Sequence, residues 1–490
     1  MPYEPVVGLE IHAQLLTASK IFCGSSTTFG AAPNTHVCPV CLGLPGALPV
    51  LNRRAVDGAI RAALALNCVV HETSVFARKN YFYPDLPKGY QISQYERPLA
   101  TGGVVAAGSD YWTPDHDIRI KRVHMEEDAG KLLHEGFKDS DGHSYVDLNR
   151  AGIPLIEIVT EPDLRSAREA AAFFTYLREL LVAIGVNDGN MEEGSLRCDA
   201  NVSVRPGGAT DLGTKVEIKN LNSFRFVERA IEHEIARQVG QLDAGGRVMQ
   251  ETRLWDATAG RTFSMRSKEE AHDYRYFPEP DLPLLVASAA RVAAIRGTLP
   301  ELPLDRRRRL ATAYGLTASD AVALTIARPG LGVYFEDIVR AGAEAKSAKN
   351  WVLGSVSAKM NELGLDNAGR FAERVPAARL AALLALVDRG TISGSTAKDV
   401  FEKMVATGAA AEEIVAAEGL RQIDDETTIV TSIEDVLARN EDAVAQFRGG
   451  KAGALGYLVG QVMKATAGKA NPKRVNELLK RKMDEMSHQP

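Results

Sequence analysis

The hydrophobic pattern changes once along this chain of 490 residues, and that change constrains the fold. Up to about residue 292, short runs alternate apolar with polar residues between Gly- and Pro-rich turns, which is typical of β-strands. Two helical stretches interrupt them, Arg53–Leu66 and Ser166–Ile184, and Ser166 with Glu169 predicts a capping box at the start of the second. Strands mixed with separate helices predict an α+β domain.

After a proline-rich segment at 280–283 the sequence pattern is almost entirely helical. Charge divides this helical region, because residues 409–450 hold ten acids and three arginines whereas residues 451–490 hold eight Lys/Arg and three acids. We therefore expect three domains, the last two of them helical: 1–292, 293–408 and 409–490.

The composition is that of a soluble globular protein, with 45% hydrophobic and 25% charged residues and a net charge of −5. No apolar run reaches the roughly 18 residues that a membrane span requires. The segment 1–5 lacks the charged and apolar regions of a signal peptide, so we expect a cytoplasmic protein. Five cysteines are too few for a disulfide framework in a chain of this length.

Three consecutive acids, Glu126, Glu127 and Asp128, follow an alternating segment and precede a turn at Gly130. Neighbouring carboxylates raise one another's pKa unless a cation lies among them. Mg²⁺ binds through one or two carboxylates and leaves room for substrate phosphates, so the run suggests metal-assisted phosphate chemistry. The alternative is a solvated acidic turn. If the strand continues through the run, Glu126 and Glu127 lie on opposite faces, and one of them is expected to pair with a Lys or Arg.

Further acids lie in other strand-like runs. Glu10 and His12 share one face of the first run, and Glu157 lies inside an apolar run. Asp199 and Glu217 occupy similar positions less clearly. A single acid of this kind usually lies at a polar edge or pairs with Arg or Lys, because burying it unpaired is costly. Several such strands more readily form a shared floor for metal ions.

Cys38 and Cys41 form a CxxC pair, with Cys23 upstream. A structural zinc site needs four nitrogen or sulfur ligands. His36 is a candidate for the fourth ligand, and Ser25 is a candidate for the place of a lost one. Reduced cysteines without a metal are the alternative.

Two loops, at 79–90 and 274–283, combine prolines with tyrosines and phenylalanines. Such rings receive a nucleotide base or a single-stranded RNA end, or else they stiffen a surface loop. The basic helical segment at 456–482 suits contacts with a phosphate backbone, or is an ordinary solvated helix face. No glycine-rich phosphate loop is present, so a bound ATP would be held through carboxylate-bound metal.

Together these runs resemble the GatB family, the B subunits of tRNA-dependent amidotransferases, over essentially the whole chain. The matching segments are 8–12, 37–46, 124–131, 199–205, 215–222, 273–283 and 459–472. The resemblance implies an antiparallel-sheet cradle similar to the glutamine synthetase fold, followed by two helical domains, the last of which binds tRNA.

The resemblance also implies an activity. In this family the chain uses ATP and Mg²⁺ to phosphorylate the side-chain carboxylate of Glu-tRNA(Gln), Asp-tRNA(Asn) or both, and ammonia then displaces the phosphate. The ammonia comes from glutamine hydrolysed by the A subunit, an amidase, and a small C subunit connects the two. A tRNA-binding scaffold without chemistry of its own is the alternative from another class.

Carried onto this sequence, the family's metal-binding and phosphoryl-transfer residues are Glu10, His12, Glu126, Glu127, Glu157, Asp199 and Glu217, with Glu10, His12, Glu126 and Glu127 expected to be catalytic. Lys79 is implied at the mouth of an ammonia channel. The expected tRNA-binding residues are Lys464, Lys469, Lys473 and Arg474. The resemblance makes Cys23, Cys38, Cys41 and His36 candidate zinc ligands, but many cysteine-bearing members carry a fourth thiol near the place where this chain has Ser25.

Overall fold

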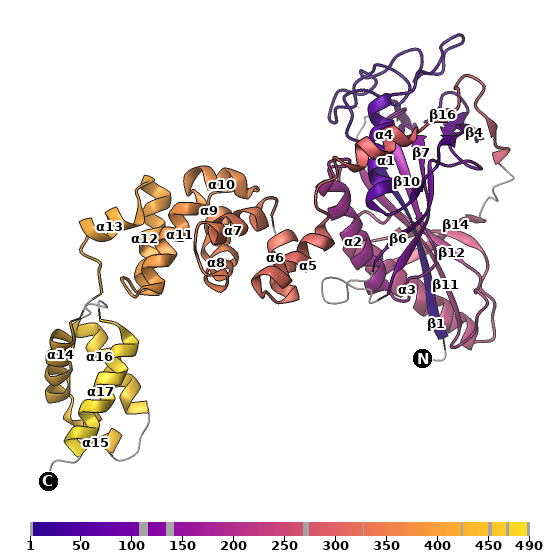
Figure 1. The fold of residues 1–490 in the computed structure, drawn as a ribbon. Helices are drawn as coiled ribbons and strands as arrows, with labels where there is room; N and C mark the ends of the chain where they lie inside the picture. The colour runs from indigo at the N-terminus through magenta and orange to yellow at the C-terminus, as the bar shows by residue number, and fades with distance from the viewer. Residues whose placement is uncertain are drawn as a thin grey trace. The chain divides into compact units, whose positions relative to one another are not determined.

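The computed structural model describes residues 3–106, 116–133, 142–267, 274–326, 328–422, 425–448, 453–466 and 470–487. The chain divides into two compact units, Met1–Arg306 and Arg307–Pro490 (Figure 1), and each is described by itself. Among the described residues, every helix is too short or too polar to cross a membrane.

The first unit is built on a nine-stranded sheet with the strand order β14-β13-β12-β11-β1-β10-β7-β6-β2 (Figure 1). Its strands are β1 (Tyr3–Gln14), β2 (Val69–Val70), β6 (Ala100–Val105), β7 (Ile118–Glu127), β10 (Pro154–Thr160), β11 (Leu196–Pro206), β12 (Val216–Lys219), β13 (Glu251–Asp256) and β14 (Arg261–Ser267).

The sheet is mixed, so the prediction of an antiparallel sheet is wrong at one place. β12 and β13 run parallel, whereas the other described neighbours pair antiparallel. Parallel neighbours need a long crossover connection, which the 20-residue helix α3 (Phe224–Asp243) provides between these two strands. The mixture of strands and helices predicted for this region is confirmed.

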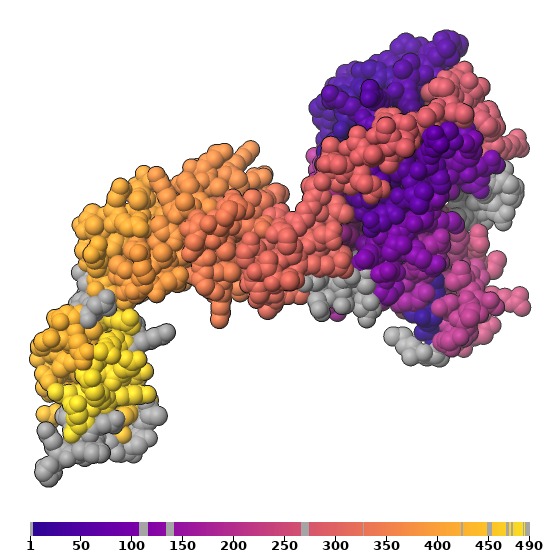
Figure 2. Space-filling model, viewed as in Figure 1, coloured from indigo at the N-terminus to yellow at the C-terminus, as the bar shows by residue number. Residues whose placement is uncertain are grey.

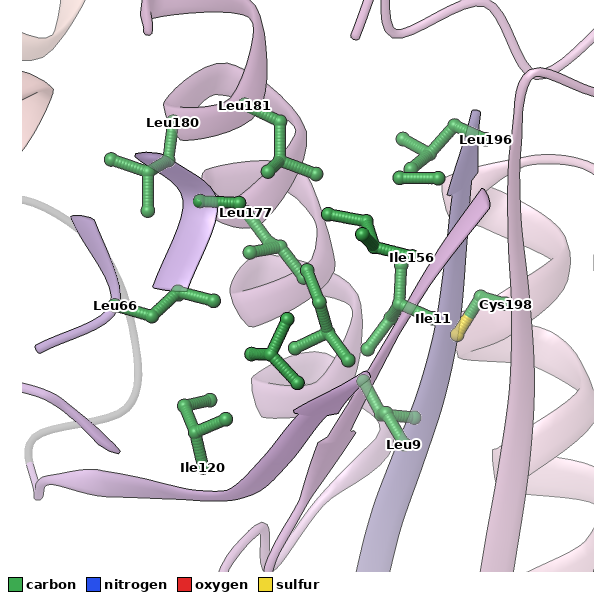
Figure 3. Close-up of a cluster of buried hydrophobic side chains, with 14 of the residues drawn as sticks. Leu9, Ile11, Leu66, Ile120, Ile156, Leu177, Leu180, Leu181, Leu196 and Cys198 are labelled. Atoms are coloured by element: carbon green, nitrogen blue, oxygen red, sulfur yellow. The ribbon is translucent and has the colours of Figure 1, made fainter. Parts of the chain in front are cut away.

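The central strand β1 has one apolar and one polar face. Leu9 and Ile11 are buried in the main hydrophobic core, whereas Glu10 and His12 point to the opposite side. Leu177 and its neighbours on α2 (Ala167–Ala183) pack against the apolar side, and Figure 3 shows these leucines facing β1 and Ile156. The core therefore lies on one side of β1, and Glu10 and His12 lie on the other.

The two helices predicted in the first unit are confirmed nearly to the residue. Helix α1 spans Arg53–Ala65 and α2 spans Ala167–Ala183, with Ser166 as the N-cap of α2. The Ser166 hydroxyl accepts a hydrogen bond from the Glu169 amide at 3.1 Å. The Glu169 carboxylate accepts from the amide of Arg165, one residue earlier than in a standard capping box.

Smaller sheets and one further helix complete the first unit. Helix α4 (Ala289–Arg296) packs on α1, where Arg291 pairs with Asp57 at 2.7 Å, and Figure 2 shows this salmon-coloured segment on the body of the unit. The remaining strands are β3 (Thr73–Ser74), β4 (Ala77–Asn80), β5 (Tyr90–Ser93), β8 (Lys131–Leu133), β9 (Tyr145–Asp147), β15 (Phe277–Pro278) and β16 (Leu285–Val286).

From residue 303 onward the described chain is helical, as predicted. The helices are α5 (Pro303–Tyr314), α6 (Ala318–Ile326), α7 (Leu331–Arg340), α8 (Ala345–Trp351), a π-helix (Val352–Val356), α9 (Ser357–Glu362), α10 (Ala368–Arg374), α11 (Ala377–Asp388), α12 (Gly394–Thr407), α13 (Ala411–Ala417), α14 (Glu426–Arg439), α15 (Glu441–Arg448), α16 (Gly453–Ala465) and α17 (Pro472–Ser487). Helices α14 to α17 share a hydrophobic core of their own. The proposed domain boundaries at 293 and 409 stay predictions.

The packing of α2 on the sheet predicts a stability difference within one helix. We expect Leu177→Ala to cost about 2–5 kcal/mol, because the fully buried side chain leaves a cavity against β1. Val182→Ala on the same helix, 38% exposed, should change stability by less than about 1 kcal/mol. Hydrogen exchange of peptides from β1 and α2 measures both changes. Equal protection in the two variants would contradict this packing.

Candidate functional site

Acidic side chains from five adjacent strands line one cavity of about 640 Å³ on the polar side of the sheet. We call this cavity the acidic trough. Its floor contains six of the residues expected to bind metal, namely Glu10, His12, Glu126, Glu157, Asp199 and Glu217.

Strand register brings these side chains together. Because β1 lies between β10 and β11, His12 is directly opposite Glu157, and Glu10 is directly opposite Asp199. Residues that face one another across antiparallel strands point to the same side of the sheet. Each strand alternates polar and apolar residues, and the pairing of the strands joins their polar faces into one surface across β7, β10, β1, β11 and β12.

Three of these residues form a group suited to a metal ion, which we call the metal triad: His12, Glu126 and Glu157. One ligand atom from each lies within 4.8 Å of the others. The Nε2 atom of His12 is 3.4 Å from Glu157 Oε2 and 3.7 Å from Glu126 Oε1. Two carboxylate oxygens with one imidazole nitrogen suit Mg²⁺ or Mn²⁺, so the residues fit the implied cation.

The residues of the metal triad shift one another's pKa values strongly. Burial by itself lowers the pKa of His12, but the hydrogen bond to Glu157 and the charges of Glu157 and Glu126 raise that pKa to about 9. Burial favours the neutral form of Glu157, yet the neighbouring imidazoles of His124 and His12 hold its pKa well below the ordinary value. Burial likewise favours the neutral form of Glu126, but the hydrogen bond to His124 and the charge of His12 hold its pKa below the ordinary value. Both carboxylates are therefore ionised.

Sequence reasoning missed His124, which lies beside the metal triad. Its Nε2 atom is 3.5 Å from Glu157 Oε2 and 3.7 Å from Glu126 Oε2, and its side chain is 3% exposed. The buried Nδ1 atom has no hydrogen-bond partner among the described residues. Alternation could have found His124, because residues 124 and 126 share a face of β7.

The other acids of the trough surround a lysine that sequence reasoning also missed. The ammonium of Lys219 donates to Asp199 Oδ2 at 2.6 Å and lies 3.4 Å from Glu217 Oε1. Glu217 also accepts from the Thr252 hydroxyl, and Glu10 accepts from the Asn201 amide group, both at 2.9 Å. In this structure Asp199 and Glu217 have an internal cation.

Glu127 lies away from the metal triad. Its carboxylate accepts from Lys88 Nζ at 2.6 Å and from the Ile92 amide at 2.9 Å. With Lys20 and Cys41 it lines a separate cavity of about 140 Å³. The expected alternation of Glu126 and Glu127, with one of them paired to a lysine, is thus present in β7.

Asp128 ends the acidic run and has a third environment. Burial favours its neutral form, but Arg197 at 3.0 Å and Arg150 at 3.8 Å hold its pKa below the ordinary value. It also accepts from the Gln14 side chain at 2.8 Å. The three consecutive acids are therefore buried and separately paired, and the solvated-turn alternative for them is wrong.

Tyrosines form a wall of the trough beside Lys79. The Tyr95 and Tyr276 rings stack with centroids 4.3 Å apart, and the Tyr81 and Tyr274 rings meet edge to face. The ammonium of Lys79 lies 4.8 Å from the Tyr274 ring centroid. The two aromatic loops of the sequence thus meet at one site.

The sulfur atoms of Cys23, Cys38 and Cys41 lie within 4.8 Å of one another, and His36 is not part of this described group. The Cys38 amide donates to Cys41 Sγ at 3.0 Å, and Ser25 Oγ is 3.8 Å from the same sulfur. A hydrogen bond from Cys23 is the main reason why the pKa of Cys41 falls to about 4. Three thiol groups suit a soft cation, one ligand short of a closed zinc site.

The expected tRNA-binding residues lie in the second unit. Arg474 on α17 pairs with Glu426 and Glu477, and Lys464 is exposed in the last turn of α16. Lys473 is in the first turn of α17, whereas Lys469 lies outside the described residues.

Comparison with known proteins identifies the family. Residues 5–293 match the GatB/GatE catalytic domain, and residues 333–483 match the GatB domain. The B subunit of the aspartyl/glutamyl-tRNA(Asn/Gln) amidotransferase from Anaeromyxobacter sp. (strain K) is 57% identical over 98% of this chain and 99% of its own length. The corresponding protein of Geobacter sulfurreducens is 55% identical, and that of Moorella thermoacetica 54%, each over 99% of this chain and all of its own length. The chain therefore belongs to the GatB/GatE family.

Proposed function

We propose that this chain is the amidating component of a tRNA-dependent amidotransferase. It uses ATP to phosphorylate the side-chain carboxylate of Glu-tRNA(Gln), Asp-tRNA(Asn) or both, and ammonia then displaces the phosphate. The observation that carries the proposal is the metal triad in an acidic trough with a tyrosine wall. The relatives named above are B subunits of aspartyl/glutamyl-tRNA(Asn/Gln) amidotransferases.

In this proposal His12, Glu126 and Glu157 hold a Mg²⁺ ion. When bound, the ion neutralises phosphate charge during in-line transfer of the γ-phosphoryl group to the carboxylate oxygen. His124 and Ser93 keep Glu126 in place, Ser93 by donating to its Oε2 at 3.1 Å. Arg122, 3.8 Å from Glu157, adds positive charge beside the incoming phosphates.

The tyrosine wall is proposed to receive the end of the tRNA. An unpaired terminal base can stack on an exposed ring face, and such stacking tolerates any base. The Lys79 ammonium lies 5.5 Å from the Tyr81 ring centroid and 4.8 Å from that of Tyr274, and we place it where ammonia enters the trough. In this proposal Glu127 is not a metal ligand, and its role is to hold Lys88 in place.

The partners follow from the same proposal. A glutaminase, the A subunit, supplies ammonia, a small C subunit connects the two larger chains, and the assembly works in the cytoplasm. The first unit is proposed to share the cradle architecture of glutamine synthetase, which also forms a glutamyl phosphate. The basic residues of α16 and α17 would contact the tRNA backbone, although Arg474 must first loosen its pair with Glu426.

A scaffold that binds tRNA without chemistry is the alternative. A scaffold needs no group of three potential metal ligands in one cavity, so the metal triad favours the enzyme. ATP turnover stimulated by Glu-tRNA would favour the enzyme, and tRNA binding without turnover would favour the scaffold. Amidation of each mischarged tRNA by the reconstituted complex decides which substrates are used.

We expect His12→Ala and Glu126→Gln to lower amide formation at least about 100-fold, because each variant removes a ligand that neutralises charge in phosphoryl transfer. Glutamine hydrolysis by the assembled complex should stay close to wild type, since it takes place in the partner glutaminase. Both rates are measured on one preparation.

Glu232→Gln is the matched control, because Glu232 is an exposed acid of α3 outside the trough. Its amidation rate should equal the wild-type rate. Full amidation by both triad variants would refute the proposed role of the metal triad.

For the cysteine group we propose a zinc ion with three thiolate ligands and an exogenous fourth ligand. Elemental analysis of the purified full chain should give about one zinc per chain, falling to near zero in Cys38→Ser. Cys68→Ala, at a cysteine of the hydrophobic core, should keep its zinc. A zinc-free wild-type chain prepared without chelator would leave the cysteines as plain thiols.

A further inference from the structure

The Lys219 ammonium occupies a position inside the trough that resembles that of a bound cation. It is 2.6 Å from Asp199 Oδ2 and 3.4 Å from Glu217 Oε1, two acids on adjacent strands. Burial by itself lowers the pKa of Lys219, but the charges of Asp199 and Glu217 raise it above the ordinary value. A lysine amine is charged at neutral pH in any case, so the two carboxylates already have a cation beside them.

The trough thus neutralises its acids in two different ways. Glu126 and Glu157 of the metal triad face imidazole rings, and His12 is itself one of the three potential metal ligands. Asp199 and Glu217 instead face the ammonium of Lys219, a donor-only group that offers no ligand atom to a metal ion. An ammonium and a divalent cation that share the same oxygens would also repel one another strongly at these short distances. A divalent cation can therefore reach Asp199 and Glu217 only after Lys219 moves.

The lysine side chain is suited to such a move. Its ammonium is a compact charge on a flexible four-carbon stem, and it binds phosphate oxygens well. The side chain of Lys219 is 38% exposed and opens into the trough, so it can reach a ligand there without rearrangement of the sheet. A nucleotide in the trough would bring phosphate oxygens that compete with the two carboxylates.

We propose that Lys219 is an exchangeable cation of the phosphoryl-transfer site. In the nucleotide-free enzyme its ammonium closes Asp199 and Glu217 to divalent cations. When a metal–nucleotide complex enters, Lys219 transfers to a phosphate oxygen, and the two carboxylates become available to a second divalent ion. This inference rests on the proposed function, because it assumes that the trough binds a nucleoside triphosphate.

The test is Mn²⁺ binding to the full-length chain without nucleotide, followed by electron paramagnetic resonance. Wild type should bind one Mn²⁺ tightly at the metal triad. Lys219→Met keeps the length of the side chain but removes the charge, and it should bind a second Mn²⁺ at least about tenfold more tightly than wild type does. Lys219→Arg keeps the charge and should behave like wild type.

A double variant locates the second ion. Adding Asp199→Asn to Lys219→Met should abolish the second Mn²⁺, whereas adding His12→Ala should abolish the first and leave the second. Lys219→Gln repeats the measurement with a polar neutral side chain if Lys219→Met folds poorly, as judged by circular dichroism.

ATP kinetics in the assembled complex supply the second readout. The KM for ATP should rise at least about tenfold in Lys219→Met and be largely restored in Lys219→Arg. Unchanged Mn²⁺ stoichiometry and affinity in both neutral variants would overturn the inference. That outcome is distinct from failure of the proposed function, which would appear as wild-type chain without ATP-dependent amidation.

Discussion

The register of β1 between β10 and β11 is the constraint on which the rest of the site depends. It sets His12 opposite Glu157 and Glu10 opposite Asp199, while Leu9 and Ile11 enter the core on the other side. A slip of one residue would turn Glu10 and His12 into the core and expose Leu9 and Ile11. Burial of the core under α2 and formation of the site therefore require the same register. The stability of the core and the geometry of the site therefore depend on the same strand pairing.

The carboxylates differ in the basic side chain that each one contacts, and this difference separates their proposed roles. His12 and His124 flank Glu157, Lys219 holds Asp199, and Lys88 holds Glu127 on the far side of β7. An imidazole nitrogen can itself be a metal ligand, whereas an ammonium has no acceptor atom and must leave before a metal ion can take its place. In our proposals, the metal triad binds one metal ion and Asp199 with Glu217 is closed until a ligand draws Lys219 away, whereas Glu127 lies outside the trough.

Much of this arrangement was predictable from local pattern. Alternation placed Glu10 and His12 on one face and separated Glu126 from Glu127, and the capping signal at Ser166 located α2. The partners of the acids were only partly predictable. Alternation along β12 places Lys219 on the same face as Glu217. The contact of Lys219 with Asp199 depends on strand pairing, and Lys88 reaches Glu127 from the turn before β5, in a different sheet, so spacing along the chain reveals neither contact. The parallel β12–β13 pair was missed for the same reason, since the direction of a strand depends on the crossover before it.

The central claim is that the trough activates a carboxylate on tRNA by phosphorylation. The most direct measurement uses Glu-tRNA(Gln) labelled with ¹⁸O in its side-chain carboxylate, amidated by the complete complex with ATP. The account predicts that about one labelled oxygen appears in inorganic phosphate for each amide formed, because the bond to phosphorus forms at that oxygen. Amide formation with all of the released label in water would contradict it.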